Sequence, residues 1–302
     1  MADAKLPFYF SVDFEDFGHD YRRALGERDP PCNEAALWKS YERVNYFSDK
    51  FFGGRRVTFF VTGVVARAVP GLVKQIAGDG HEIACHYNFH DRISDGARAE
   101  LGPNLDEAIR AIEAAAGVTP VGFRAPYFAI DPGDDWAFEE LAKRFLYDSS
   151  YRTSERRDDL APGGLLRVGD HALREFFIYG EPHMSGRFSV RTGGTFLRLF
   201  PSGITIDAML SGSKMGHDAL LYVHSYELLT GSEFWVAWKD FAKLPAKNRR
   251  LNLRVQWARQ MQWIKVGHKG VERKLGAICK HFEHQGPMRL AAESQGVGLS
   301  IA

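Results

Sequence analysis

The sequence predicts an α/β fold organised around a mostly parallel β-sheet. Segments of strand and helix character alternate along the 302 residues, as they do when helices connect parallel strands. Polar, chemically reactive residues recur where the predicted strands end, which is typical of barrel-type α/β enzymes. The chain contains no internal repeat, low-complexity segment or linker-like stretch, so we expect residues 1–302 to form a single domain.

The strand predictions depend on short runs of apolar and β-branched residues. The run Arg-Val-Thr-Phe-Phe-Val-Thr at Arg56–Thr62 favours a buried strand, and Gly63 closes it. The section Ser150–Pro201 is rich in Gly and Arg, and we expect strands and long loops there that shape the substrate cleft. The predicted strands are Leu6–Val12, Arg56–Thr62, His81–Cys85, Val121–Phe123, Leu220–His224 and a last strand that begins near Met288.

The helix predictions depend on apolar residues at helical spacing and on residues that mark helix ends. Pro70 is a favourable first residue for a short helix that Gly78 ends. Ala, Ile and Glu recur at helical spacing up to Ala116, and Gly117 follows as a C-terminal cap. The predicted helices are Glu34–Phe52, Pro70–Gly78, Leu105–Ala116, Trp136–Arg144, Val255–Lys265 and Lys269–Phe282.

The charge is unevenly distributed along the chain. The formal net charge of +1 gives no overall preference for nucleic acid or for an anionic membrane. Between Lys239 and His284, however, 12 Lys or Arg residues stand against 3 Asp or Glu residues. We interpret this segment as the solvated face of C-terminal helices. The alternative is attraction to a phosphate-bearing substrate or peripheral association with a membrane.

Cysteine usage and hydropathy predict a cytoplasmic protein. Cys32, Cys85 and Cys279 are odd in number and widely spaced, as reduced thiols are, so a disulfide framework is not expected. The first residues lack the pattern of a signal peptide, and no apolar run reaches the roughly 18 residues of a membrane-spanning helix. Cys85 adjoins His86, but we interpret it as a buried structural thiol and not as a ligand.

Acidic residues and histidines gather at the ends of two predicted strands. Asp13, Glu15 and Asp16 follow the first strand, and His86 and His90 follow the third. Two imidazoles and one carboxylate can hold a divalent metal and leave one coordination position open for water. A second carboxylate beside the ligand then offers a general base for that water. The pattern therefore predicts a metal-dependent hydrolase.

The alternation of side chains along the first strand separates its three acidic residues. On an extended strand, Asp13 and Glu15 face one side and Asp16 faces the other. We therefore favour Glu15 as the carboxylate ligand. Asp16 is the alternative if a turn begins at Phe14.

Six segments, two of which contain these residues, follow one another along the chain. They are Ser11–Asp16, Arg56–Gly63, Gly80–His90 with its His-x-x-x-His, Gly122–Tyr127, Phe145–Ser150 and Leu220–His224. Together they resemble the motifs of the polysaccharide deacetylase family, which is also called the NodB-homology family or carbohydrate esterase family four. The resemblance extends from Phe8 to about Glu227. One further pattern resembles that of the family branch found with bacterial exopolysaccharide and O-antigen gene products. It consists of Gly193, Gly194, Arg198 and Pro201.

The resemblance implies a distorted (β/α) barrel of about seven parallel strands. The motif-bearing core would cover about residues 6–230, and the basic helical part, about 239–284, would pack on the barrel. It also implies metal-dependent removal of an N-acetyl or related N-acyl group from an amino sugar of a cell-surface polysaccharide or its precursor. Zinc suits the ligand set best, although cobalt, nickel or iron could occupy the same site.

The resemblance also implies a role for each motif residue. Asp13 would be the general base, and Arg124 would pair with it and orient it. The two histidines would be metal ligands. The backbone N–H of Tyr127 would stabilise the oxyanion. His224 would be the general acid, with Asp148 holding its other ring nitrogen.

Two other functions remain open. A cyclic-amide or ureide hydrolase of the same fold would dispense with the metal, and the intact His86 and His90 argue against it. A non-catalytic carbohydrate-binding barrel would need no base and acid pair, so the presence of Asp13, Arg124 and His224 together argues against that alternative.

Overall fold

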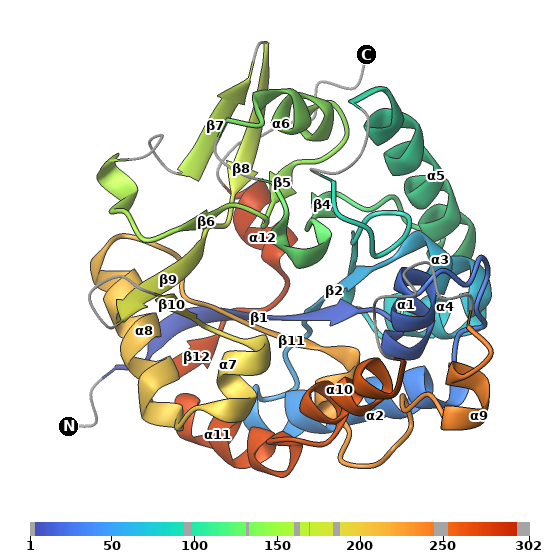
Figure 1. Cartoon of the computed structure of the whole chain (residues 1–302). Coiled ribbons are helices and arrows are strands. Elements are labelled where there is room, and N and C mark those ends of the chain that lie inside the picture. Colours follow the sequence, from blue (N-terminus) through green and yellow to red (C-terminus); the bar gives the residue numbers. More distant parts are fainter. Residues whose placement is uncertain are drawn as a thin grey trace.

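The computed structural model describes residues 4–93, 98–130, 133–159, 164–168, 170–183, 188–244 and 253–294. Its central sheet has parallel strands in the order β11–β1–β2–β3–β4–β5–β8, while β7 runs antiparallel to β8 and β12 pairs with the start of β1 (Figure 1). These strands are β1 (Leu6–Phe14), β2 (Thr58–Val61), β3 (Glu82–Cys85), β4 (Gly122–Phe123), β5 (Tyr147–Asp148), β7 (Leu165–Val168), β8 (His171–Glu175), β11 (Leu220–His224) and β12 (Phe282–His284).

A second, three-stranded sheet lies between the two ends of the central one. It consists of β6 (Arg152–Thr153), β9 (Ile178–His183) and β10 (Phe188–Arg191). An isolated bridge from Gly193 to Tyr222 joins the segment after β10 to β11. A side chain at Gly193 would come within 2.3 Å of the Tyr222 carbonyl oxygen, so this contact requires glycine. The fold is the distorted α/β barrel that the sequence predicts.

Helices surround the barrel and connect its parallel strands (Figure 1). Their bounds are α1 (Phe17–Ala24), α2 (Glu34–Phe51), α3 (Gly63–Ala68), α4 (Pro70–Gly78), α5 (Arg98–Ala116), α6 (Asp135–Ala142), α7 (Gly194–Leu199), α8 (Ser202–Lys214), α9 (Trp238–Phe241), α10 (Leu253–Ile264), α11 (Val271–Ile278) and α12 (Met288–Glu293). Short 3₁₀ turns occur at η1 (Pro126–Phe128), η2 (Arg157–Asp159), η4 (Ser225–Leu228) and η5 (His268–Gly270).

The strand β1 is buried on both faces and separates two apolar regions. Phe8, Phe10, Val12 and Phe14 belong to the larger core cluster, which also includes residues of α2, α4 and α5. Tyr9, on the opposite face, packs against the smaller cluster inside the barrel. This alternation follows from the two-residue period of a strand, and it directs the odd-numbered residues of β1 inward.

The helix α12 closes the end of the barrel at which the parallel strands begin. Met288 and Ala292 are fully buried in the inner apolar cluster. The backbone N–H of Met288 donates to Oγ1 of Thr58, at the start of β2, at 2.9 Å. The N–H of Arg289 donates to Oε2 of Glu82, at the start of β3, at 3.1 Å. Side chains at the opposite, carboxyl ends of the strands are therefore the ones that can form a site.

The structure differs from the sequence prediction mainly at the C-terminus. The strand expected near Met288 is wrong: a helix occupies Met288–Glu293, and the last strand within the described ranges is Phe282–His284. The helix expected over Lys269–Phe282 ends at Ile278, so Phe282 and His284 can alternate with exposed Glu283 in a strand. Sequence patterns also missed the helices α1, α3, α7, α8 and α9.

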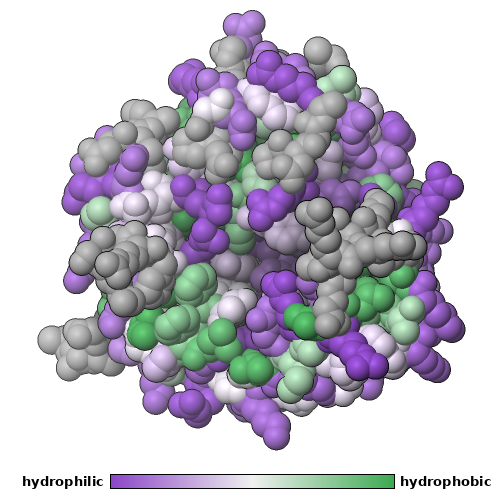
Figure 2. Space-filling view, in the orientation of Figure 1, coloured by the Kyte–Doolittle hydropathy of each residue, from purple (hydrophilic) through white to green (hydrophobic). Residues whose placement is uncertain are grey.

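The basic C-terminal part forms α9, α10 and α11, although residues 245–252 of it lie outside the described ranges. Figure 2 shows hydrophobic side chains among hydrophilic ones over the lower part of the molecule, where α7, α10 and α11 lie. Leu199 and Met261 are among the exposed large hydrophobic residues. Within the described ranges, no helix has the length and apolar character needed to cross a membrane. Peripheral membrane association stays a prediction.

Candidate active site

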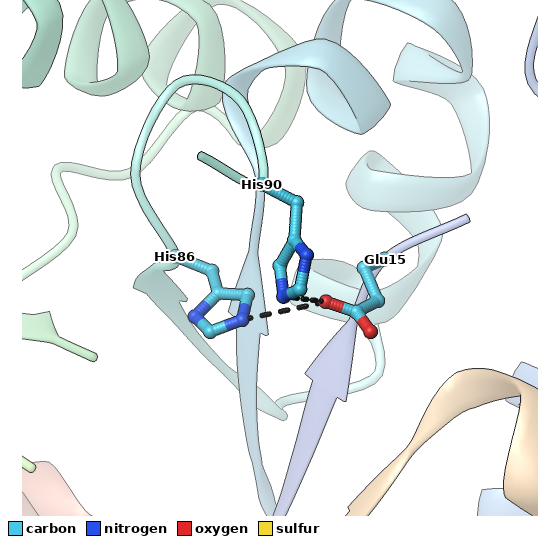
Figure 3. A group of neighbouring side chains, drawn as sticks. All are labelled: Glu15, His86 and His90. Atoms are coloured by element: carbon cyan, nitrogen blue, oxygen red, sulfur yellow. Dashed lines mark ion pairs between the residues drawn. The ribbon is translucent and has the colours of Figure 1, made fainter. Parts of the chain in front are cut away.

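Glu15, His86 and His90 come together at the carboxyl end of the sheet. Glu15 follows β1, and both histidines lie on the loop after β3 (Figure 3). One potential ligand atom from each side chain lies within 4.8 Å of the other two. The Oε2 atom of Glu15 is 2.6 Å from Nε2 of His90 and 3.6 Å from Nε2 of His86. The structure thus brings together the three residues that sequence analysis favoured as metal ligands.

The loop that carries the two histidines is held by the start of α3. The backbone N–H groups of Gly63 and Val64 donate to the carbonyl oxygens of Tyr87 and Asn88, each at 2.9 Å. Tyr87 has a left-handed conformation, with φ of 66°, which is unfavourable for a bulky residue. A side chain at Gly63 would come within 2.6 Å of Oδ1 of Asn88. Glycine at this position therefore allows α3 to approach the loop closely.

Hydrogen bonding fixes which nitrogen of His86 is available to a ligand. Its Nδ1 lies 2.8 Å from the carbonyl oxygen of Arg124, so Nδ1 carries the proton and donates it. The Nε2 atom of His86 is buried without a hydrogen-bond partner in the described structure, whereas the Oε2 atom of Glu15 is in an ion pair with His90. Burial raises the pKa of Glu15, but His90 and His86 outweigh burial and lower it overall. An imidazole nitrogen without a hydrogen bond, beside the Glu15 carboxylate and the second imidazole of His90, fits a divalent metal.

The general base predicted from the sequence forms a buried ion pair. Asp13 is the β1 residue two positions before Glu15, and its Oδ1 accepts a hydrogen bond from Nη1 of Arg124 at 2.7 Å. Arg124 is fully buried, and it also donates to Oγ of Ser11 at 2.8 Å and to Oγ of Ser149 at 2.9 Å. The guanidinium group therefore has a fixed position, and Asp13 is oriented by it as the sequence predicts.

Asp16, the alternative metal ligand, is engaged elsewhere. It is the N-terminal cap of α1, and its carboxylate accepts from the backbone N–H groups of His19 and Asn33. Because β1 continues through Phe14, the side chain of Glu15 lies on the same side of the strand as that of Asp13. Asp16 is then the cap that precedes α1. Among the described residues, the cluster that could hold a metal contains Glu15 and not Asp16.

His224 has a carboxylate partner, but this partner is not Asp148. Its Nδ1 lies 2.9 Å from Oε2 of Glu227, three residues further along the chain. The other oxygen of Glu227 accepts from Nε of Arg198 at 2.6 Å, and both residues of that pair are buried. The expectation that Asp148 holds His224 is therefore wrong. Sequence analysis missed Glu227, although a glutamate three residues after the histidine was a signal that could have identified it.

Asp148 has a different, supporting position. Its Oδ1 accepts from Oγ of Ser150 at 2.6 Å, and that same Oγ accepts from the backbone N–H of Ala125 at 2.7 Å. Burial and the neighbouring Asp148 raise the pKa of Glu175 well above its ordinary value, so one proton is retained between the two acids. Asp148 therefore fixes the turn that follows Arg124.

The surroundings of His224 favour its protonated form. Burial alone lowers the pKa of His224, but the Glu227 carboxylate outweighs burial and raises the pKa to about 9. The ring of Tyr226 stacks on the imidazole with centroids 5.1 Å apart. Gly194, with φ of 52°, gives the ring room, because a side chain there would come within 3.1 Å of its Cε1 atom. Arg198 donates to Glu227, and Gly194 lies beside His224. Both residues belong to the pattern that sequence analysis identified between Gly193 and Pro201.

Tyr127 borders the cluster on a strained turn. Its φ is 59° and that of Phe128 is 52°, so two consecutive non-glycine residues are left-handed. The Tyr127 ring lies against His90, with ring centroids 4.4 Å apart. Strain of this kind persists only where the surrounding structure imposes it, and here the Asp148–Ser150–Ala125 hydrogen bonds lie just before the turn.

Comparison with known proteins identifies relatives that are described as deacetylases. Residues 53–142 match the sequence model of the polysaccharide deacetylase family. A peptidoglycan deacetylase-like protein from Gibberella zeae is 36% identical over 95 residues, which are 32% of this chain and 28% of that protein. A chitooligosaccharide deacetylase from Sinorhizobium fredii is 38% identical over 71 residues, which are 23% of this chain and 33% of that protein. The chain therefore spans about a third or less of these curated relatives.

The fold also matches a solved structure. A crystal structure from Mycobacterium smegmatis, assigned to the polysaccharide deacetylases, superposes with a TM-score of 0.55. The match covers 99% of this chain and 94% of that one at 20% sequence identity. At this identity the likeness demonstrates a common fold.

Purified protein is expected to contain about one divalent metal ion per chain, and His86→Ala or His90→Ala should remove it. Each substitution leaves two protein ligands, whereas a catalytic zinc site has three. Elemental analysis of wild type and variants, with His171→Ala as a matched control outside the cluster, measures this. Equal metal content in all four proteins would contradict the ligand assignment.

Proposed function

We propose that this chain, whose residues 53–142 match the polysaccharide deacetylase family, is a metal-dependent hydrolase that removes an N-acetyl or related N-acyl group from an amino sugar. The sugar would be part of a cell-surface polysaccharide or its precursor. The observation that carries the proposal is the meeting of three elements at one end of the sheet. They are the Glu15–His86–His90 cluster, the Asp13–Arg124 pair and the His224–Glu227 pair.

The ligand set supports zinc as the metal. Two imidazole nitrogens and one carboxylate oxygen are a usual set for a catalytic zinc ion, and the other divalent metals named above accept the same donors. When bound there, the ion would supply Lewis acidity to the acyl oxygen and to the attacking water. The Nε2 atom of His86, buried beside Glu15 without a hydrogen bond, supports a metal-dependent reaction over a metal-independent cyclic-amide hydrolase.

The Asp13–Arg124 and His224–Glu227 pairs support two proton transfers, one from the attacking water and one to the leaving nitrogen. Asp13 and His224 are register partners on the neighbouring strands β1 and β11, so their side chains lie on the same face of the sheet. Asp13 would take a proton from water as the water oxygen bonds to the acyl carbon. His224, whose pKa is raised to about 9, would be protonated near neutral pH and would give its proton to the nitrogen as the C–N bond breaks. The products are a free amine and a carboxylate.

Two further groups would assist these transfers. Arg124 holds the Asp13 carboxylate at 2.7 Å, on the face of β1 that Glu15 also takes. The backbone N–H of Tyr127, on its strained turn, would donate to the oxyanion of the tetrahedral intermediate. A non-catalytic sugar-binding barrel would need neither an oriented base nor a histidine with a raised pKa, so these pairs favour catalysis.

The substitution Asp13→Asn is expected to lower turnover about 10²–10⁴-fold while the metal stays bound, because it removes a base and not a ligand. Steady-state kinetics on an N-acetylated chitooligosaccharide, with metal analysis of the same samples, measures both effects. If Asp13→Asn lost the metal while Glu15→Gln kept it, Asp13 would be the ligand and Glu15 the base.

The substitution His224→Ala should slow hydrolysis of an N-acetyl sugar much more than hydrolysis of an activated aryl acetate. An amine must be protonated to leave, whereas an aryloxide departs without an acid. We expect a loss of about 10²–10⁴-fold on the amide and a far smaller loss on the ester. The same loss on both substrates would mean that the acid lies elsewhere.

Activity should decline as the pH rises through about 9, because the acid His224 then loses its proton. The carboxylate of Glu227 raises that pKa, so Glu227→Gln should move the alkaline limb of the kcat/KM profile to lower pH by more than about one unit. The profile is measured on variants that circular dichroism shows to be folded. An alkaline limb at the same pH in both proteins would contradict the role of Glu227.

A further inference from the structure

A buried lysine, Lys274, lies on α11, beyond the residues over which the motifs extend. Its Nζ donates to the carbonyl oxygens of Leu197 at 2.8 Å and of Arg198 at 2.6 Å. Both carbonyls belong to the last turn of α7, where a helix leaves its carbonyl groups without partners in the helix. Lysine is rarely buried, because removing an ammonium group from water is costly. This costly placement fixes the backbone that carries Arg198.

Arg198 joins that backbone to the carboxylate that holds His224. Its Nε donates to Oε1 of Glu227 at 2.6 Å. Its Nη1 donates to the carbonyl oxygens of Gln262 at 2.8 Å and of Val266 at 2.7 Å, at the end of α10. One side of the guanidinium group is thus bonded to Glu227 and the other to α10. Because the group is planar and rigid, its bonds to α10 determine where it meets Glu227.

The segment that joins α10 to α11 also packs closely against Arg198. Gly267 has a φ of 85°, and a side chain there would come within 2.5 Å of the Arg198 carbonyl oxygen, so this approach requires glycine. The helix α10 is itself fixed by Gln260, which is fully buried. Its Oε1 accepts from the backbone N–H of Val236 at 2.9 Å, and its Nε2 donates to the Val236 carbonyl oxygen at 3.2 Å. The groups that hold Arg198 are therefore held in place themselves.

These contacts end at His224. Glu227 accepts from Nδ1 of His224 at 2.9 Å and from its backbone N–H at 3.0 Å. The bond at Nδ1 fixes the orientation of the imidazole ring, and so the direction of its Nε2. A series of contacts therefore connects Lys274 to His224 through Arg198 and Glu227, and these first three residues are buried. A displacement of about 1 Å in a catalytic group can lower a rate about 100-fold.

We propose that Lys274 is a positioning residue, which acts through Arg198 and Glu227 to direct His224 at the leaving nitrogen. The helices α10 and α11 are then part of the catalytic unit. Neither helix lies within residues 53–142, which match the family model, or within the motifs identified in the sequence. This inference rests on the proposed function, in which His224 is the acid.

The test uses two variants that disturb Arg198 from different sides. Lys274→Met removes the ammonium group and keeps a long side chain, and Gly267→Ala introduces the close contact with the Arg198 carbonyl. The matched control is Arg273→Met, because Arg273 is the neighbouring, exposed cation on α11. Turnover of an N-acetylated chitooligosaccharide and of an activated aryl acetate is measured on zinc-loaded proteins, each also in a His224→Ala background. Circular dichroism and metal analysis accompany every sample.

Each of the two variants is expected to lower amide turnover about 10-fold and aryl acetate turnover less than about threefold, because the aryloxide needs no acid. In the His224→Ala background neither should change amide turnover more than about twofold, since no acid is left to position. Arg273→Met should match its parent. The proposal is overturned by equal losses on both substrates, by a loss that persists without His224, by the same loss in Arg273→Met, or by wild-type turnover in both variants.

A second measurement does not require turnover. The Nδ1–H group of His224 donates to Glu227, so its proton should give a downfield NMR signal in ¹⁵N-histidine-labelled, zinc-loaded protein. The absence of this signal from His224→Gln assigns it. It is expected to be the same in wild type and Arg273→Met, and to be shifted or broadened in Lys274→Met. An unchanged signal in Lys274→Met overturns the proposal.

The two measurements separate this inference from the proposed function. A chain that deacetylates the chitooligosaccharide, with turnover and an NMR signal of His224 that do not depend on Lys274, contradicts the positioning role alone. A chain whose His224 signal depends on Lys274 but which never releases acetate contradicts the proposed function alone.

Discussion

The alternation of side chains along β1 is the constraint on which the rest of the site depends. This strand lies between β11 and β2 in a parallel sheet, and its odd-numbered side chains point into the barrel. Asp13 and Glu15 therefore share one face, and Asp13 is paired in register with His224. A shift of the strand by one residue would direct both acids into the apolar layer that Val12 and Phe14 now occupy, at the cost of burying unpaired charges.

The second constraint is that charges buried beside the cluster are compensated. Arg124 pairs with Asp13, and Arg198 pairs with the glutamate that holds His224. Removing one partner of such a pair costs about 3–5 kcal/mol, because the other is left as an uncompensated buried charge. His86 differs from these residues: Glu15 has His90 at 2.6 Å, but the Nε2 atom of His86 is buried without a hydrogen bond. A bound metal ion would remove that cost, so metal binding and stability should be linked.

Much of this site could be predicted from the sequence because it depends on strand ends and on the two-residue period. The alternation along β1 favoured Glu15 over Asp16, and the spacing of His86 and His90 after a strand indicated the other two ligands. Those inferences require only local geometry. The barrel itself followed from the alternating elements and from the resemblance of the ordered motifs.

The remaining features depend on tertiary contacts that no local pattern encodes. Asp148 is the last residue of a strand, as His224 is, yet its carboxylate accepts from Ser150, and Glu227 reaches His224 from the next turn. The helix at Met288 forms because two of its side chains fill the barrel interior, where sequence alone suggested a strand. Lys274 lies on a predicted helix, but sequence patterns missed α7, whose carbonyl groups it contacts, so its link to Arg198 was not foreseen.

The central claim is that Glu15, His86 and His90 form one metal centre, and a zinc-soaked crystal examined at the zinc absorption edge tests it most directly. The claim predicts a strong anomalous peak about 2.0–2.2 Å from Nε2 of both histidines and from a Glu15 oxygen. An empty cluster, with the anomalous signal at other residues or absent, would contradict it.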